Sequence, residues 1–109
     1  MKLIKAIVRP NKVDEVKDAL AKLNVSGVTV TEVRGHGKQK GHTAIYRGKE
    51  YNVSLLPKME IEIVVADSLA DEAIKAIIEA ARTGEIGDGR VFVTPVLESY
   101  RIRTGEKES

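Results

Sequence analysis

The residues of this 109-residue chain that are best suited to chemistry gather in three segments that combine glycine with basic side chains. The first segment is GHGKQKGHTAIYRGKEYN at 35–52, with glycines at 35, 37, 41 and 48. Its basic side chains are those of Lys38, Lys40, Arg47 and Lys49. Glycine lets backbone N–H groups approach a ligand closely, and lysine or arginine beside them favours an anion. The segment therefore predicts an anion-binding loop, and the alternative is a solvated loop without a ligand.

The second segment, TGEIGDGR at 83–90, carries three glycines, follows Arg82 and ends with Arg90. Consecutive N–H groups with an arginine on either side suit the oxygens of a phosphate. The same residues also fit ordinary turn chemistry, with Gly84 as a helix C-cap and Asp88-Gly89 as a turn. Taken alone, this segment leaves both interpretations open.

The third segment is RIRTG at 101–105, where Arg101 and Arg103 would project together from an extended backbone. A surface arginine pair is otherwise simply solvated. Three glycine-and-base segments in one small chain indicate a polyphosphate ligand, although composition does not say which one.

The overall composition excludes several classes of protein. Eighteen basic and sixteen acidic residues give a net charge of +2, which is too small for a protein that coats nucleic acid or anionic membrane. The chain has no cysteine, so it forms neither disulfides nor thiolate zinc sites. No stretch approaches the roughly 20 apolar residues that span a bilayer. We expect one domain, residues 1–109, in the cytoplasm.

Hydrophobic periodicity predicts the elements that position these segments. Strands are predicted at 2–8, at 28–33, from Met59 onward and at 91–96. One helix is predicted to begin at an Asn11 cap and another at a capping box of Ser68 and Asp71.

The predicted order is strand, helix, strand, strand, helix, strand. This order is typical of the α+β ferredoxin-like sandwich, in which a four-stranded antiparallel sheet carries both helices on one face. Pro95 suits an edge strand or a strand end. More than twenty residues, about 36–57, separate the two central strands, where a hairpin needs about two to five. A loop of that length indicates a function.

The sequence resembles a known family at three long motifs. TVTEVRGHGKQKGHTAIYRGKEY at 29–51, TGEIGDGRVFV at 83–93 and RIRTGE at 101–106 are similar to the PII nitrogen-regulatory signalling proteins. The resemblance runs from Met1 to about Glu106. It implies a non-enzymatic homotrimer that binds ATP or ADP between subunits and senses nitrogen and carbon status. It also implies that the long loop, called the T-loop, docks onto partner proteins.

The resemblance assigns binding roles residue by residue. The implied nucleotide-binding residues are Thr29, Gly35, Gly37, Lys38, Gln39, Val64, Gly87, Asp88, Gly89, Arg90, Arg101 and Arg103. The implied 2-oxoglutarate-binding residues are Gln39, Lys40, Gly41, Lys58 and Gly87, and Gln39 also supplies an oxygen to a Mg²⁺ held by the ATP phosphates. Magnesium prefers hard oxygen ligands of this kind.

The T-loop has further expected features. Tyr51 matches the position that proteobacterial members uridylylate. His36, Lys49 and Arg90 depart from the commonest family pattern, and Lys49 removes a serine that cyanobacterial members phosphorylate. The implied partners are an ammonium channel, a modifying transferase or a nitrogen-metabolism enzyme, with membrane contact only through a channel and no nucleic acid.

Two other functional classes stay open on the fold alone. Ferredoxin-like folds also carry small nucleotide-processing enzymes, but no carboxylate pair or activated nucleophile stands out in this sequence. RNA-binding modules share the strand and helix order, yet they need aromatic residues on the sheet, and the chain has one phenylalanine, three tyrosines and no tryptophan.

Overall fold

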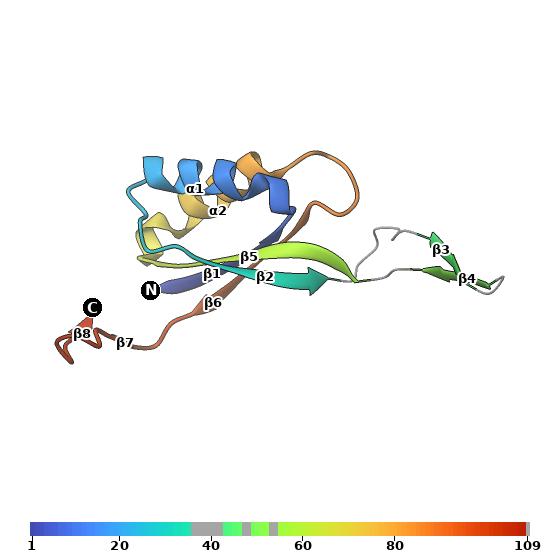
Figure 1. Ribbon diagram of the computed structural model, residues 1–109. Helices are drawn as coiled ribbons and strands as arrows, with labels where there is room; N and C mark the ends of the chain where they lie inside the picture. The colour runs from blue at the N-terminus through green and yellow to red at the C-terminus, as the bar shows by residue number, and fades with distance from the viewer. Residues whose placement is uncertain (36–42, 47–48, 53–54, 109) are drawn as a thin grey trace.

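The computed structural model describes residues 1–35, 43–46, 49–52 and 55–108. Its main sheet contains four strands, β1 (Lys2–Val8), β2 (Thr29–Gly35), β5 (Leu56–Val65) and β6 (Gly89–Pro95). They lie in the order β2-β5-β1-β6, and every neighbouring pair is antiparallel. Two helices, α1 (Val13–Lys22) and α2 (Asp67–Ala81), cover one face of the sheet (Figure 1). The predicted α+β ferredoxin-like fold is confirmed.

The core lies between the helices and the sheet. Alternate residues of the two central strands face the helices because side chains along a strand alternate between its faces. The buried strand residues are Ile4, Ala6 and Val8 of β1 and Ile61, Ile63 and Val65 of β5. The buried helix residues are Val16 and Leu20 of α1 and Ala70, Ala73, Ile77 and Ala81 of α2. The small residues of α2 let this helix lie close to the sheet.

The opposite face of the sheet carries charged side chains. Lys5 of β1 lies beside two glutamates of β5, with its Nζ 3.8 Å from a carboxylate oxygen of Glu60 and 3.6 Å from one of Glu62. The register explains the cluster, since Lys5 pairs with Glu62 across the two strands. Phe92 on the neighbouring β6 is 47% exposed, so this face is only partly polar.

Both helices begin differently from the sequence prediction. A 3-10 turn (η1, Pro10–Lys12) precedes α1. The N-cap of α1 is therefore Lys12 rather than Asn11, and its side chain makes no capping hydrogen bond. The ring of Pro10 presets a helical φ at this point and therefore replaces the cap. The capping box was also wrong, because α2 begins at Asp67 and Ser68 lies inside its first turn. The Asp67 carboxylate instead pairs with the N-terminal amine at 3.1 Å.

The ends of both helices depend on residues beyond them. Asn24 adopts a left-handed conformation, with φ of 62°, and ends α1 three residues before Gly27. Helix α2 ends at Ala81 with Arg82 as an extended C-cap, so Gly84, with φ of 90°, lies beyond the cap. The predicted edge position of Pro95 is confirmed, since it is the last residue of the edge strand β6.

Two small hairpins extend the molecule at its ends. Between β2 and β5, β3 (Thr43–Tyr46) pairs with β4 (Lys49–Asn52), and at the C-terminal end β7 (Ser99–Tyr100) pairs with β8 (Lys107–Glu108). The two hairpins stand off opposite ends of the main sheet (Figure 1). Strand β5 begins at Leu56 rather than at Met59, so the segment between β2 and β5 is 36–55, slightly shorter than the predicted 36–57.

Candidate functional site

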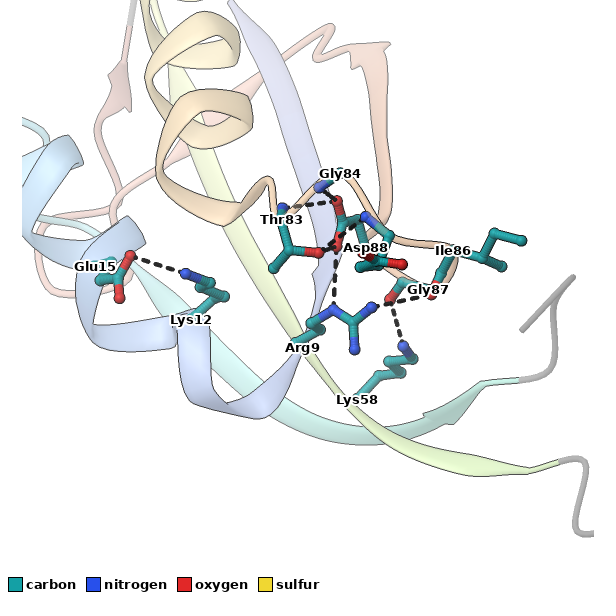
Figure 2. Close-up of polar contacts among 10 residues, drawn as sticks. Arg9, Lys12, Glu15, Lys58, Thr83, Gly84, Ile86, Gly87 and Asp88 are labelled. Carbon is teal, nitrogen blue, oxygen red and sulfur yellow. Dashed lines mark hydrogen bonds and ion pairs between the residues drawn. The ribbon is translucent and has the colours of Figure 1, made fainter. Parts of the chain in front are cut away.

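The candidate site lies at one end of the sheet, where β1 ends and where β5 and β6 begin, and we call this end the binding edge. Val8, the last residue of β1, pairs with Met59 of β5 on one side and with Gly89 of β6 on the other. This register brings Arg9 and Lys58 beside residues 82–88, which connect α2 to β6 and which we call the glycine loop (Figure 2). The glycine segment at 83–90 is therefore not all loop, because its last two residues, Gly89 and Arg90, belong to β6.

The Asp88 carboxylate holds the first half of the glycine loop. One oxygen, Oδ2, accepts hydrogen bonds from the backbone N–H groups of Thr83 and Gly84, each at 2.8 Å. The other, Oδ1, accepts one from the Thr83 hydroxyl and one from the Arg9 Nε at 3.1 Å. Both oxygens are therefore engaged within the chain, and the loop closes around them (Figure 2).

These bonds keep Asp88 ionised. The Thr83 hydroxyl is the main cause that holds the pKa of the Asp88 carboxyl well below its usual range, and the two backbone N–H groups and Arg9 act in the same direction. Partial burial opposes them by raising the pKa. Hydrogen bonds to a charged form favour that form, so Asp88 is a carboxylate at neutral pH.

Two cations hold the second half of the glycine loop by its carbonyl groups. Arg9 uses its Nη2 to donate to the Ile86 carbonyl oxygen at 3.0 Å, and Lys58 uses its Nζ to donate to the Gly87 carbonyl oxygen at 2.6 Å. Burial lowers the pKa of Lys58 below its ordinary value, the charge of Arg9 lowers it further, and Asp88 raises it. The side chain is 9% exposed, so its ammonium is an anchored charge rather than a free surface lysine.

Two glycines allow the close approaches that the site needs. A Cβ atom at Gly89 would lie 1.7 Å from the Ile7 carbonyl oxygen, and the φ of Gly89 is 107°. No other residue type fits that combination. A Cβ atom at Gly35 would lie 3.3 Å from the Lys58 Cγ, so the end of β2 passes directly beside this lysine.

A pocket of about 400 Å³ opens beside the glycine loop. Asp88, Gly89 and Arg90 form one side of it. Its apolar side comes from Ile7 and Val8 of β1, Val91 and Val93 of β6, and Ile74, Ile77, Ile78 and Ala81 of α2. Arg82 and Arg90 add positive charge, so the pocket offers apolar surface and anion-binding groups together.

Other predicted residues lie far from this edge within one chain. Thr29 begins β2 and pairs with Glu62, two residues before Val64, so both predicted residues lie near the opposite end of the sheet. Val64 lies six residue positions from Lys58 along the extended strand, a distance of about 20 Å.

Arg101 and Arg103 follow β7 and are also remote from the glycine loop (Figure 1). The Arg101 guanidinium pairs with Glu108 of β8, with its Nε 2.8 Å from a carboxylate oxygen. Both arginines are exposed. The structure thus gathers Gly35, Lys58, Gly87, Asp88, Gly89 and Arg90 at one edge and leaves Thr29, Val64, Arg101 and Arg103 elsewhere.

Some predicted residues fall outside the described ranges. Gly37, Lys38, Gln39, Lys40 and Gly41 lie in 36–42, as do His36 and His42, and of Tyr51 only the backbone, in β4, is described. In the described part of the chain, no group of three histidine or carboxylate side chains is arranged to hold a metal ion. No helix among the described residues is both long and apolar enough to cross a membrane.

Sequence reasoning missed Arg9 and Thr83. Arg9 precedes a proline at a strand end, where a basic residue is unremarkable, and its partner Asp88 is 79 positions away. A signal existed for Thr83, since a hydroxyl residue before a glycine turn often bonds to the turn backbone, as Thr83 does here with the Glu85 N–H at 3.1 Å.

Comparison with known proteins identifies the family. The profile of the family described as "Nitrogen regulatory protein P-II" matches residues 1–106. A protein of that name from Azospirillum brasilense is 61% identical over 107 residues, which is 98% of this chain and 96% of the relative. One from Rhizobium etli is 56% identical over 109 residues, 100% of this chain and 97% of the relative.

A third relative, "Nitrogen regulatory protein P-II 1" of Escherichia coli K12, is 55% identical over 108 residues, covering 99% of this chain and 96% of its own length. The family match covers the main sheet, both helices and the whole glycine loop. The chain therefore belongs to the nitrogen regulatory protein P-II family, whose members are regulatory signalling proteins of nitrogen metabolism and not enzymes.

Proposed function

We propose that this protein binds ATP or ADP in clefts between the subunits of a homotrimer, binds 2-oxoglutarate beside the nucleotide, and signals the result to partner proteins through residues 36–55. The glycine loop, Gly35, Lys58 and Arg90 of one subunit form one wall of each cleft. Thr29, Val64, Arg101 and Arg103 of the neighbouring subunit form the other.

One observation carries this proposal, namely that the expected binding residues divide between two ends of the molecule. Gly87 and Lys58 are in direct contact, with the Lys58 Nζ 2.6 Å from the Gly87 carbonyl oxygen. Val64 is about 20 Å of extended strand from Lys58, and Arg101 lies beyond the far end of β6. A nucleotide is too short to reach both groups in one chain, whereas a second copy packed against the first brings them together.

Electrostatics supports an anionic ligand at the glycine-loop edge. Arg9, Lys58, Arg82 and Arg90 lie around this edge, and the carboxylate among them, Asp88, is neutralised by its hydrogen bonds and by Arg9. Arginine pairs with phosphate oxygens through two parallel donors, which suits Arg90 to this role. The apolar part of the neighbouring pocket would accommodate uncharged surface of a ligand or of the second subunit.

The donor set suits magnesium only in combination with a nucleotide. Asp88 has both oxygens engaged, so within the described residues it is not available as a metal ligand. Magnesium commonly keeps few protein ligands and takes the rest from phosphates. When bound there, the magnesium ion would supply open coordination positions for the oxygen atoms of the keto acid. The chain would contribute the Gln39 side chain to the metal and the contacts of Lys40, Gly41, Lys58 and Gly87 to 2-oxoglutarate.

Residues 36–55 are the proposed output of the protein. Gly35, the last residue of β2, pairs with Leu56, the first residue of β5, so the loop begins and ends at the binding edge. The hairpin of β3 and β4 stands off this end of the sheet (Figure 1). An ammonium channel, a modifying transferase or a nitrogen-metabolism enzyme would dock onto it. Uridylylation of Tyr51 would add charge and bulk there and block insertion into a narrow partner site.

RNA binding on the sheet is disfavoured by charge. The open face presents Glu60 and Glu62, and a single lysine, Lys5, lies between them. Carboxylates there repel the phosphates of an RNA strand. Among its described residues, the main sheet has one aromatic side chain, that of Phe92. RNA-binding sheets of this kind use aromatic side chains to stack two or three bases.

Calorimetric titration tests the proposal. ATP should bind in the presence of Mg²⁺, and 2-oxoglutarate should bind tightly only when ATP and Mg²⁺ are both present, with a coupling of about 1–3 kcal/mol. Lys58→Ala and Gln39→Ala should weaken 2-oxoglutarate more than ATP, and Lys17→Ala, an exposed residue in the middle of α1, serves as the matched control. Equal 2-oxoglutarate affinity with and without ATP would rule out the shared site.

Native mass spectrometry tests the assembly independently. We expect a trimer that binds three nucleotides, and Arg103→Ala should leave the trimer intact while weakening ATP about ten-fold or more, because a charged contact to phosphate is lost. A stable monomer with full ATP affinity would contradict a site shared between copies.

A further inference from the structure

The orientation of two peptide groups in the glycine loop is set by cations that come from the sheet. Arg9 follows β1 and binds the Ile86 carbonyl oxygen, while Lys58 near the start of β5 binds the Gly87 carbonyl oxygen (Figure 2). The described chain contains no cis peptide bond. In a trans peptide the N–H points opposite to the C=O. The N–H groups of Gly87 and Asp88 therefore point away from Arg9 and Lys58.

This orientation gives the loop a polarity. Its carbonyl oxygens face the protein's own cations, and the N–H groups of two successive residues face the other way. Successive backbone N–H groups that face one side form a concave site for an anion. Had the two peptides flipped, the carbonyl oxygens would face a phosphate and repel it.

Asp88 fixes the other half of the loop by its side chain. The N–H groups of Thr83 and Gly84 are both used by its carboxylate, and the Glu85 N–H is used by the Thr83 hydroxyl. The carboxylate thus takes up the N–H groups of the first half and leaves the ligand to the second half. It acts through the backbone, and its own oxygens face Thr83, Gly84 and Arg9.

Arg9 connects the two halves. Its Nε binds the Asp88 carboxylate and its Nη2 binds the Ile86 carbonyl oxygen, so one planar group spans both parts of the loop. The Arg9 and Asp88 side chains are 24% and 23% exposed, which makes them a partly buried pair. A lysine would keep the charge but offers one nitrogen, which cannot reproduce the two-point fork.

We propose that Arg9, Asp88 and Thr83 are positioning residues for phosphate recognition, which hold the glycine loop with the N–H groups of Gly87 and Asp88 turned outward to the phosphates. This role rests on the proposed nucleotide binding at the same edge, and it is assigned to Arg9 because two nitrogens of its guanidinium bind the loop itself. It explains why a phosphate site contains a carboxylate, which would otherwise repel the ligand.

The test measures ATP affinity in single variants of the full chain, and it separates the loss of a charge from the loss of a hydrogen bond that orients the loop. Arg9→Gln and Asp88→Asn should each weaken ATP about ten-fold, because each removes a charge-assisted bond that orients the loop. Arg9→Lys should stay close to Arg9→Gln in ATP affinity. Thr83→Val should weaken ATP, and Thr83→Ser, which keeps the hydroxyl, should restore it.

Lys12→Gln is the matched control. Lys12 lies three residues from Arg9 and pairs with Glu15 at 3.3 Å on the exposed side of α1 (Figure 2). The variant removes the same charge from the same region without touching the loop, so it should leave ATP affinity unchanged. If Lys12→Gln weakened ATP as much as Arg9→Gln, or if Arg9→Lys restored full affinity, long-range charge would explain the effect and the positioning role would be refuted.

Amide hydrogen exchange of the nucleotide-free protein gives a second readout. In Asp88→Asn and Thr83→Val the Thr83 and Gly84 amides should exchange about ten-fold faster or more, because their acceptor is weakened or displaced. Amides in the core strand β1 should keep their protection, which shows that the variants are folded. Unchanged exchange at Thr83 and Gly84, or faster exchange with full ATP affinity, would overturn the proposal.

The two readouts also separate this inference from the proposed function. If the unaltered protein failed to bind ATP while exchange at Thr83 and Gly84 responded as expected, nucleotide binding would be wrong, and the role of Arg9, Asp88 and Thr83 in holding the loop would stand. If ATP bound normally and none of the Arg9, Asp88 and Thr83 variants weakened it, the nucleotide site would stand and the positioning role would fail.

Discussion

The effect of replacing Gly89 can be worked out from the backbone. Gly89 begins β6, pairs with Val8 and has a φ of 107°. An alanine at this position would have to adopt that unfavourable φ, which lowers the free energy of unfolding by about 1–3 kcal/mol. Its Cβ would also lie 1.7 Å from the Ile7 carbonyl oxygen, so β1 and β6 must move apart locally. Such overpacking adds about 1–3 kcal/mol, and we expect Gly89→Ala to cost about 2–6 kcal/mol in the free energy of unfolding.

Two other glycines separate the two contributions. Gly84 has a φ of 90° but no atom within 4 Å of a built Cβ, so Gly84→Ala should cost only the conformational part, about 1–3 kcal/mol. Gly27 has neither a strained φ nor a close neighbour, so Gly27→Ala should be neutral or stabilise the protein by about 0.4–1 kcal/mol.

Urea unfolding of the three variants measures these differences. All samples should have one protein concentration, because the proposed trimer would make apparent stability depend on concentration. The expected order of stability is Gly27→Ala, then Gly84→Ala, then Gly89→Ala. If Gly84→Ala lost as much as Gly89→Ala, the contact with Ile7 would contribute nothing and the steric reasoning would be refuted.

Three further predictions concern the core, the loop and the C-terminal hairpin. Leu20 is fully buried in α1, so Leu20→Ala should destabilise the protein by about 2–5 kcal/mol in the same urea assay. The pKa of Asp88 is lowered in the folded state, so its contribution to stability is present above the ordinary carboxyl range and is lost only as pH falls below it. Exchange protection of the Thr83 amide should therefore persist from pH 7 to about pH 4, and Asp88→Asn should remove it at every pH in that range. Glu108→Gln, which frees Arg101 of its partner, should change ATP affinity by no more than about five-fold in calorimetry.

The fold was predictable because the core residues recur with the regular spacing of strands and helices along the sequence. Ile61 and Ile63 alternate with glutamates along β5, and the apolar stripe of α2 repeats every three or four residues, so strand and helix faces follow directly. Helix starts were not predictable in the same way. The Asn11 and Ser68 caps are patterns that also occur within helices, and here Pro10 and the Asp67 ion pair take their place.

The residue types of the site could be predicted from the sequence, but the contacts between those residues could not. Glycines and bases at 83–90 marked the loop, and the resemblance singled out Lys58, but their meeting depends on the register of β1 with β5 and β6. Arg9 is recognisable only from that register, since its bond to Asp88 joins residues 79 positions apart. Contacts between residues so far apart in the chain form only when the sheet is assembled, and no short sequence motif indicates them.

The C-terminal arginines raise a question of competition, because Arg101 already has an anionic partner within its own chain. The pair with Glu108 is 2.8 Å long, yet the two side chains are 60% and 39% exposed. Exposed ion pairs of this kind contribute about 0–1 kcal/mol, since water screens them and two long side chains lose freedom. A charge-assisted bond to a phosphate in a closed cleft is worth about 1.5–3 kcal/mol. In the proposed trimer, a phosphate held by the neighbouring subunit would therefore replace Glu108 as the partner of Arg101, because the exposed ion pair costs little to break.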